Sequence, residues 1–305
     1  MTYEEFKDTV VARINDYLPA SYQDAAISIA PVLKNNNRRL DGLLIRRMLA
    51  DGTNTESVAP NIYLNQFYEE YKDGRELEDI LSEIARIRKS HEGPLDLDVA
   101  AITDWEQVKP KVLVKLVNSA QNAEYLEGKP HKDIADLSAI YYIDLGTDSC
   151  GNMTTVITDA LLSQYGVSVE ELHQTAVQNM GSKARFCSMF EVLSELMPDN
   201  SPVDELPQSD GQMYILTNQN KVNGASMILC PQIMDEIGRQ IGTSYFVLPS
   251  SINELILVKS ENEFDVDALR TMVREVNSTQ LAADEILSES VYLYDYDIHS
   301  LVVAA

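Results

Sequence analysis

The sequence has few of the residues on which several common kinds of protein chemistry depend. Among its 305 residues there are three cysteines, four histidines and one tryptophan. Cys150, Cys187 and Cys230 lie far apart, which fits neither a disulfide framework nor the ligand spacing of a zinc site. We therefore expect reduced thiols, as in a cytoplasmic protein, and no metal ion.

Positive charge is also scarce. The chain has 24 Lys and Arg residues against 48 Asp and Glu residues, which gives a formal net charge of −24. A field of this sign repels nucleic acids and anionic lipid surfaces. We expect no nucleic-acid partner, and the charge instead favours a basic protein partner.

Long apolar runs and standard cofactor motifs are missing as well. The first residues contain neither the basic nor the apolar segment of a secretory signal, and no apolar run reaches the roughly 18 residues that span a bilayer. The sequence contains no Gly-x-Gly-x-x-Gly dinucleotide loop and no complete phosphate loop. The prediction is a cytoplasmic protein without a membrane segment and without a cofactor. The oligomeric state is left open.

The N-terminal region, residues 1–92, predicts a helix, a hairpin and two more helices. Thr2 and Glu5 form a capping box that begins the first helix. Two apolar segments, 26–33 and 40–49, flank three consecutive asparagines at 35–37, a pattern typical of a β-hairpin. The segment 34–47 is the one markedly basic stretch of the chain, and pairing with nearby acids is the favoured interpretation.

The remainder predicts mixed sheets, so the fold class is α+β. Residues 110–200 form a central unit with strands and a helix capped by Ser168, followed by a helix at about 185–196. Residues 208–305 read as β-α-β-β-α-β, the element order of a ferredoxin-like sandwich, with a last strand at 291–298. These regions could also form one compact domain.

Several short motifs resemble an uncharacterised bacterial family. They are Leu64–Tyr68, Leu172–Ala176 with Asn179, Tyr214–Asn218, Asn223–Ser226, Leu248–Ile252, and Val276 with Asn277. As a set they resemble the domain-of-unknown-function family DUF5688 over nearly the whole chain. The C-terminal half is also distantly similar to DUF1444, another uncharacterised family. The resemblance implies a bacterial cytoplasmic protein and implies no activity, cofactor or catalytic residue.

Polar loops of the C-terminal region are the first candidate site. Asn218, Asn223 and Ser226 lie in a turn that contains Gly224, while Ser250 and Ser251 interrupt a pair of strands. In a ferredoxin-like arrangement both loops lie at sheet ends, where pockets occur. A turn that only closes the fold explains the same residues and is the favoured interpretation.

The last predicted strand is the second candidate site. Alternation along 291–298 places Tyr292 and Tyr294 on one face and Asp295 and Asp297 on the other. The tyrosines favour packing over a binding platform. The two carboxylates favour a solvated acidic edge over a cation site.

Two hypotheses about function follow. The favoured one is a non-catalytic interaction or regulatory protein that uses its acidic surface to bind a basic partner. The alternative is a hydrolase-like or small-molecule-binding enzyme that uses the polar loops near Asn223 and Ser250. The second hypothesis needs a base beside a nucleophile, and the four histidines show no such spacing; His173 is expected to be structural.

Overall fold

A computed structural model describes residues 1–48, 59–90, 102–148, 151–196, 213–249, 251–260 and 265–304. Cys150 and Ser250 lie outside the described residues. The chain divides into two compact units that share it discontinuously. Unit 1 comprises residues 1–34, 38–98 and 146–153, and unit 2 comprises residues 35–37, 99–145 and 154–305. Whether the three predicted regions fold as separate domains stays a prediction.

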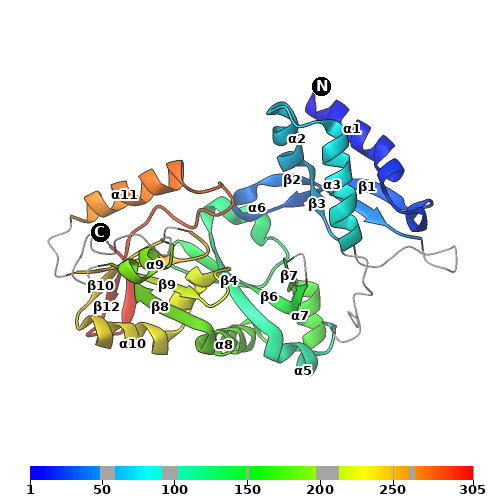
Figure 1. Cartoon of the computed structure of the whole chain (residues 1–305). Coiled ribbons are helices and arrows are strands. Elements are labelled where there is room, and N and C mark those ends of the chain that lie inside the picture. Colours follow the sequence, from blue (N-terminus) through cyan, green and yellow to red (C-terminus); the bar gives the residue numbers. More distant parts are fainter. Residues whose placement is uncertain are drawn as a thin grey trace. The chain divides into compact units, whose positions relative to one another are not determined.

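Unit 1 is a small antiparallel sheet with three helices on one face (Figure 1). The capping box is present, because the Glu5 carboxylate accepts from the amide of Thr2 and the Thr2 hydroxyl accepts from the amide of Glu5. Gly74 is left-handed (φ 98°) and separates the second and third helices, as the spacing predicts. The elements are α1 (Tyr3–Arg13), β1 (Ala26–Leu33), β2 (Arg39–Arg46), β3 (Ile62–Tyr63), α2 (Leu64–Lys72) and α3 (Leu77–Ser90).

The core of unit 1 lies between the helices and alternate residues of the sheet. Ile27 and Ile29 of β1 pair with Ile45 and Leu43 of β2, and these side chains face the helices. The guanidinium of Arg88 is also inside, where its Nε donates to the carbonyl of Ile45 at 2.8 Å. The hairpin predicted from the segments 26–33 and 40–49 is therefore confirmed, with its second strand at Arg39–Arg46.

Unit 2 contains two sheets that share one core. The smaller sheet has the order β4-β6-β5, with β7 paired to β6. Its strands and neighbouring helices are α5 (Trp105–Val108), β4 (Val112–Asn118), α6 (Ala123–Leu126), β5 (His131–Ile134), β6 (Leu137–Asp148), β7 (Gly151–Val156), α7 (Asp159–Tyr165) and α8 (Val169–Met180). One hydrophobic cluster runs from Trp105 to Tyr294, so the central and C-terminal regions are packed together.

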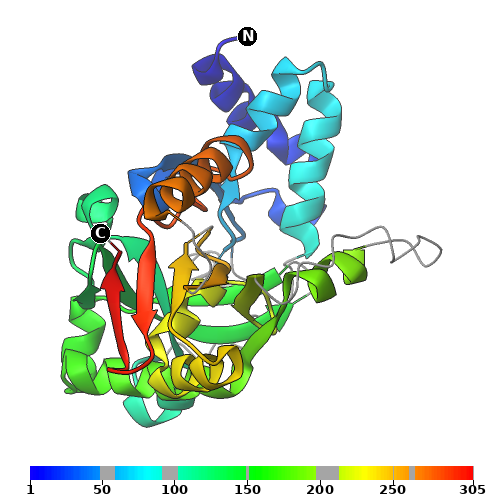
Figure 2. The same cartoon turned by 90° about the vertical axis from the view of Figure 1, so that its left-hand side faces the viewer.

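The larger sheet of unit 2 has six antiparallel strands in the order β13-β12-β10-β11-β9-β8. Figure 2 shows β12 and β13 side by side, in orange-red and red. The elements are β8 (Ala184–Ser188), α9 (Met189–Leu196), β9 (Met213–Asn218), a 3₁₀ helix (Gly224–Leu229), α10 (Pro231–Ile241), β10 (Tyr245–Leu248), β11 (Leu255–Lys259), α11 (Val266–Thr279), β12 (Tyr292–Asp295) and β13 (Ser300–Val303).

The helices α10 and α11 cover opposite faces of this larger sheet (Figure 1). Tyr245 and Val247 point toward α10, whereas Phe246 and Leu248 point toward α11. The predicted helix and strand order from β9 to β12 is present, with Pro231 at the start of α10 and left-handed Gly242 at its end. The ferredoxin-like sandwich is not confirmed, because that arrangement places both helices on one face.

Two local predictions are wrong. The segment 185–196 begins as strand β8, which pairs with β9, and becomes helical only at Met189. The strand predicted over 291–298 ends at Asp295, and residues 296–299 form the turn into β13. Among the described residues, no helix combines the length and the apolar character needed to cross a membrane.

Candidate functional site

The Asn218–Ser226 loop, the first predicted site, is closed by its own side chains. The Asn218 amide donates to the carbonyl of Val222 at 2.6 Å and accepts from the amide of Val222 at 3.2 Å. Asn223 is left-handed (φ 54°), a conformation that asparagine tolerates better than most residues. Its backbone N–H donates to Oδ1 of Asn253 at 3.0 Å, and its side chain hydrogen-bonds the buried Tyr142. Both asparagines therefore hold the loop in place.

Gly224 lets this loop approach the loop between β10 and β11. A Cβ at this position would lie 2.2 Å from Oγ1 of Thr217 and 2.4 Å from the carbonyl oxygen of Asn253. The next residue, Ala225, donates its N–H to the carbonyl of Ile252 at 3.2 Å. The structure thus brings the two predicted loops together, as backbone packed against backbone.

Ser226 and Ser251 are buried and bonded to the backbone. The Ser226 hydroxyl donates to the carbonyl of Asn223 at 2.6 Å, and the Ser251 hydroxyl accepts from the amide of Asn253 at 3.0 Å. Ser250, the remaining serine of this prediction, lies outside the described residues. These contacts account for both described hydroxyls without a substrate.

The second predicted site, on β12, is divided between core and surface. Tyr292 and Tyr294 are buried in the core of unit 2, and the Tyr294 ring stacks on Tyr245 with 5.1 Å between ring centroids. Asp295 lies at the end of the strand, where its Oδ1 accepts from the amides of Asp297 at 3.0 Å and Ile298 at 3.3 Å. Asp297 is exposed in the turn, so the two acids do not share a strand face. Among the described residues there is no cluster of three or more metal-binding side chains.

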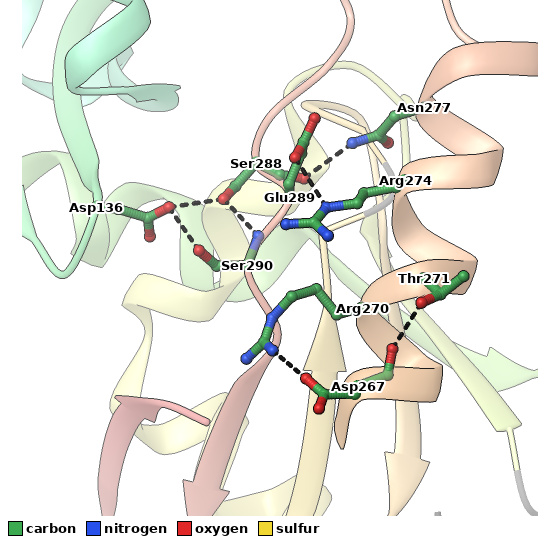
Figure 3. Close-up of polar contacts among 9 residues, drawn as sticks. All are labelled: Asp136, Asp267, Arg270, Thr271, Arg274, Asn277, Ser288, Glu289 and Ser290. Carbon is green, nitrogen blue, oxygen red and sulfur yellow. Dashed lines mark hydrogen bonds and ion pairs between the residues drawn. The ribbon is translucent and has the colours of Figure 1, made fainter. Parts of the chain in front are cut away.

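A carboxylate that the sequence analysis missed lies near the start of β12. Asp136, in the turn between β5 and β6, accepts from the hydroxyls of Ser288 at 2.7 Å, Ser290 at 2.9 Å and Tyr292 at 2.6 Å. Figure 3 shows both serines pointing toward Asp136. Burial, and then the bond to Asp136, raise the pKa of Tyr292, so it stays a neutral donor.

Other contacts hold the same connection between α11 and β12. The Asn277 amide donates to the carbonyl of Ser288 at 3.0 Å, and Arg274 pairs with Glu289 at 3.1 Å (Figure 3). The sequence could have indicated that three hydroxyls share one face, because alternate residues of an extended chain point to one side, as Ser288, Ser290 and Tyr292 do. Nothing in the sequence indicated that Asp136 would be their acceptor.

Asp235 on α10 forms a second polar cluster at the other end of β12. One of its oxygens accepts from the Tyr294 hydroxyl and lies 2.6 Å from Nδ1 of His299. The bond from Tyr294, and then that from His299, hold the pKa of Asp235 below its usual value. This cluster ties the β12–β13 turn to α10.

His173 behaves as the structural histidine that was expected. Its Nδ1 lies 3.0 Å from the hydroxyl of the buried Tyr141. Burial, and then the nearby Lys132, lower the pKa of His173, whereas Glu170 opposes the shift. The imidazole is therefore neutral at pH 7 and serves as a packed hydrogen-bond partner of Tyr141.

Comparison with known proteins gives one family. The sequence model of a family of unknown function, DUF5688, matches residues 3–296. No curated protein and no solved structure matches the chain. The resemblance to DUF5688 that the motifs indicated is therefore confirmed, and the distant similarity to DUF1444 stays a prediction.

Proposed function

We propose that this chain, which belongs to the family of unknown function DUF5688, is a non-catalytic binding protein that recognises a basic protein partner through its C-terminal region. The observation that carries this proposal is the charge of residues 275–305. This segment contains no Lys or Arg and six acids: Glu275, Asp284, Glu285, Glu289, Asp295 and Asp297. The field of such a segment attracts cationic surfaces and speeds their association.

The contacts of the polar loops favour binding over catalysis. Asn218, Asn223, Ser226 and Ser251 all bond to backbone or side chains of the two loops themselves or of the adjoining core. A serine nucleophile needs a base within hydrogen-bond reach and an open path to substrate. Buried hydroxyls that bond to backbone groups supply neither, so the enzyme alternative has less support from the geometry.

A cytoplasmic location is part of the proposal. Cys187 and Cys230 are free and buried, and burial raises the pKa of Cys230 to about 11, so this thiol is unreactive at neutral pH. Free thiols are typical of reducing compartments.

The test is affinity capture with the full chain as bait. Extract from the cells that produce the protein would be applied in about 0.05 M salt and eluted in about 0.5 M salt, because screening weakens exposed charge pairs. The expected result is a protein of high pI that binds at low salt and is released at high salt. A partner that is acidic, or one whose retention does not change with salt, would overturn the proposal.

Two variants with matched surface changes locate the binding face. The first combines Asp295→Asn with Asp297→Lys; asparagine keeps the acceptor that Asp295 offers to the turn, so the turn is preserved. The second combines Asp8→Asn with Asp24→Lys in unit 1, which makes the same change of charge at two exposed acids. Binding should fall by about tenfold or more in the first variant only. Equal retention by both variants would rule out the C-terminal region.

A further inference from the structure

Strand β13 forms one edge of the six-stranded sheet within the described part of the chain. We infer that this edge is where the partner binds, and that the partner adds an extended, basic segment to it as a seventh strand. The inference rests on the proposed function, and it specifies how the partner binds and which kind of segment it uses. Addition of a strand to an open edge is a common way to recognise extended peptides.

The backbone pattern of β13 shows which groups are open. The amide of Ala304 donates to the carbonyl of Val291 at 2.8 Å, and Leu293 lies opposite Val302. In an antiparallel pair, residues alternate between bonding to the neighbour strand and facing away from it. The N–H and C=O groups of Val302 therefore point toward β12, and those of Leu301 and Val303 point outward.

Contacts with the rest of unit 2 fix the position of β13. Leu301 packs against the core of unit 2, and Nη2 of Arg270 donates to the carbonyl of Ala304 at 3.2 Å. Val302 and Val303 are each 45% exposed, and Ile298 in the adjoining turn is 68% exposed. Exposed β-branched residues on a fixed edge offer apolar contact to both faces of an incoming strand.

The pairs in this sheet are all antiparallel, so we take the added strand as antiparallel to β13, and charge then shows which of its ends is basic. Asp295 and Asp297 lie where β13 begins, and Arg270 lies where it ends. In an antiparallel addition, the C-terminal end of the incoming strand lies beside the beginning of β13. The partner should therefore carry Lys or Arg at the C-terminal end of an otherwise β-branched segment.

A second copy of this chain is a poorer occupant of the same edge. Each copy has a formal net charge of −24, and like charge opposes association of the two. A cationic segment instead gains attraction from the acidic turn. We therefore expect the occupant of this edge to be a basic segment of another protein.

Synthetic peptides test the inference directly. The probe is a fluorescent peptide of alternating valine and threonine with two lysines at its C-terminus, measured by anisotropy against the full chain. A peptide of the same composition with the lysines at its N-terminus should bind about tenfold more weakly. A third peptide, N-methylated at alternate residues so that it cannot form the ladder, should lose binding by about tenfold or more.

Protein variants give the matching controls. Val303→Pro removes an outward N–H while leaving the inward ladder bonds, and proline is tolerated at such edge positions. Val303→Thr keeps the N–H and the branched shape. Binding should be lost in the first and kept in the second, and saturating peptide should slow amide exchange at Leu301 and Val303 in the unmodified chain.

The outcomes separate the two proposals. Equal binding of the methylated and unmethylated peptides, or no change in Val303→Pro, would overturn strand addition. If capture of the basic partner then still depends on Asp297, the proposed function stands without it. A dimer of the free protein that dissociates in Val303→Pro would assign the edge to a second copy and would likewise overturn the inference.

Discussion

Gly224 shows how strictly one residue can be determined by its surroundings. The Asn218–Ser226 loop reaches the β10–β11 loop only because this position has no side chain. We expect Gly224→Ala to lower the free energy of unfolding by about 3 kcal/mol, since either Thr217 or the backbone at Asn253 must move. Urea denaturation measures this directly.

Gly181 provides the matched control for that substitution. It has a right-handed helical conformation (φ −53°), and a Cβ there would meet nothing within 4 Å. Gly181→Ala should leave stability unchanged or raise it by about 0.5 kcal/mol. Equal losses of unfolding free energy in the two variants would mean that the close backbone approach is not the reason for glycine at position 224.

The connection between α11 and β12 depends on a single carboxylate, Asp136, for three of its hydrogen bonds. Asp136→Ala leaves the hydroxyls of Ser288, Ser290 and Tyr292 without this acceptor, and Ser288 is buried. The free energy of unfolding should fall by about 2–4 kcal/mol. Amide exchange measured by mass spectrometry should also become faster in residues 282–290.

Asp133 lies on the adjoining strand, β5, and serves as the control. It is exposed and accepts from a single hydroxyl, that of Ser138. Asp133→Ala should cost about 1 kcal/mol and leave exchange in residues 282–290 unchanged. If Asp136→Ala has no larger effect than this, the carboxylate is not an anchor of the connection.

Elements with local signals could be predicted from the sequence. Three such signals are the capping box of α1, the asparagines between β1 and β2, and Pro231 at the start of α10. Each acts within a few residues, so the elements predicted from them are present in the structure. The failures depended on distant partners. Ala184–Ser188 is a strand because β9 pairs with it, and the helical pattern of residues 185–196 gave no sign of this.

The candidate site was predicted less well for the same reason. The loops at Asn223 and Ser251 were expected at sheet ends, but their contact and their burial depend on packing between segments far apart in the chain. Asp136 was not considered, since its three donors follow it by about 150 residues and no spacing rule links them. The acidic character of Asp295 and Asp297 could be read from the sequence, but they were expected on one face of a strand, and the turn at 296–299 was not predicted.

Net charge acts on the molecule as a whole. A formal charge of −24 destabilises the compact state through repulsion between acids. Raising ionic strength from about 0.01 M to about 0.15 M shortens the screening length from about 30 Å to about 8 Å. We expect the free energy of unfolding in urea to rise over this range.

Sodium chloride and potassium chloride should act alike in that measurement, because screening depends on ionic strength and not on the cation. A stability that falls with salt would mean that attractive ion pairs, such as Arg75 with Glu70 and Glu83, outweigh the general repulsion. A difference between the two cations would point to specific ion binding.

The division of the chain between the two units has a consequence for biosynthesis. Residues 35–37 belong to unit 2 although the strands on either side belong to unit 1, and unit 1 takes its last residues from 146–153. A ribosome releases the chain from its N-terminus, so unit 1 lacks its final segment until residue 153 has been made, well after residue 98. Unit 2 receives residues 35–37 early and its last described strand only once Val303 has been made. Incomplete sheets with unpaired edges are therefore exposed during elongation. The high net negative charge opposes aggregation of the nascent chain while these edges are open.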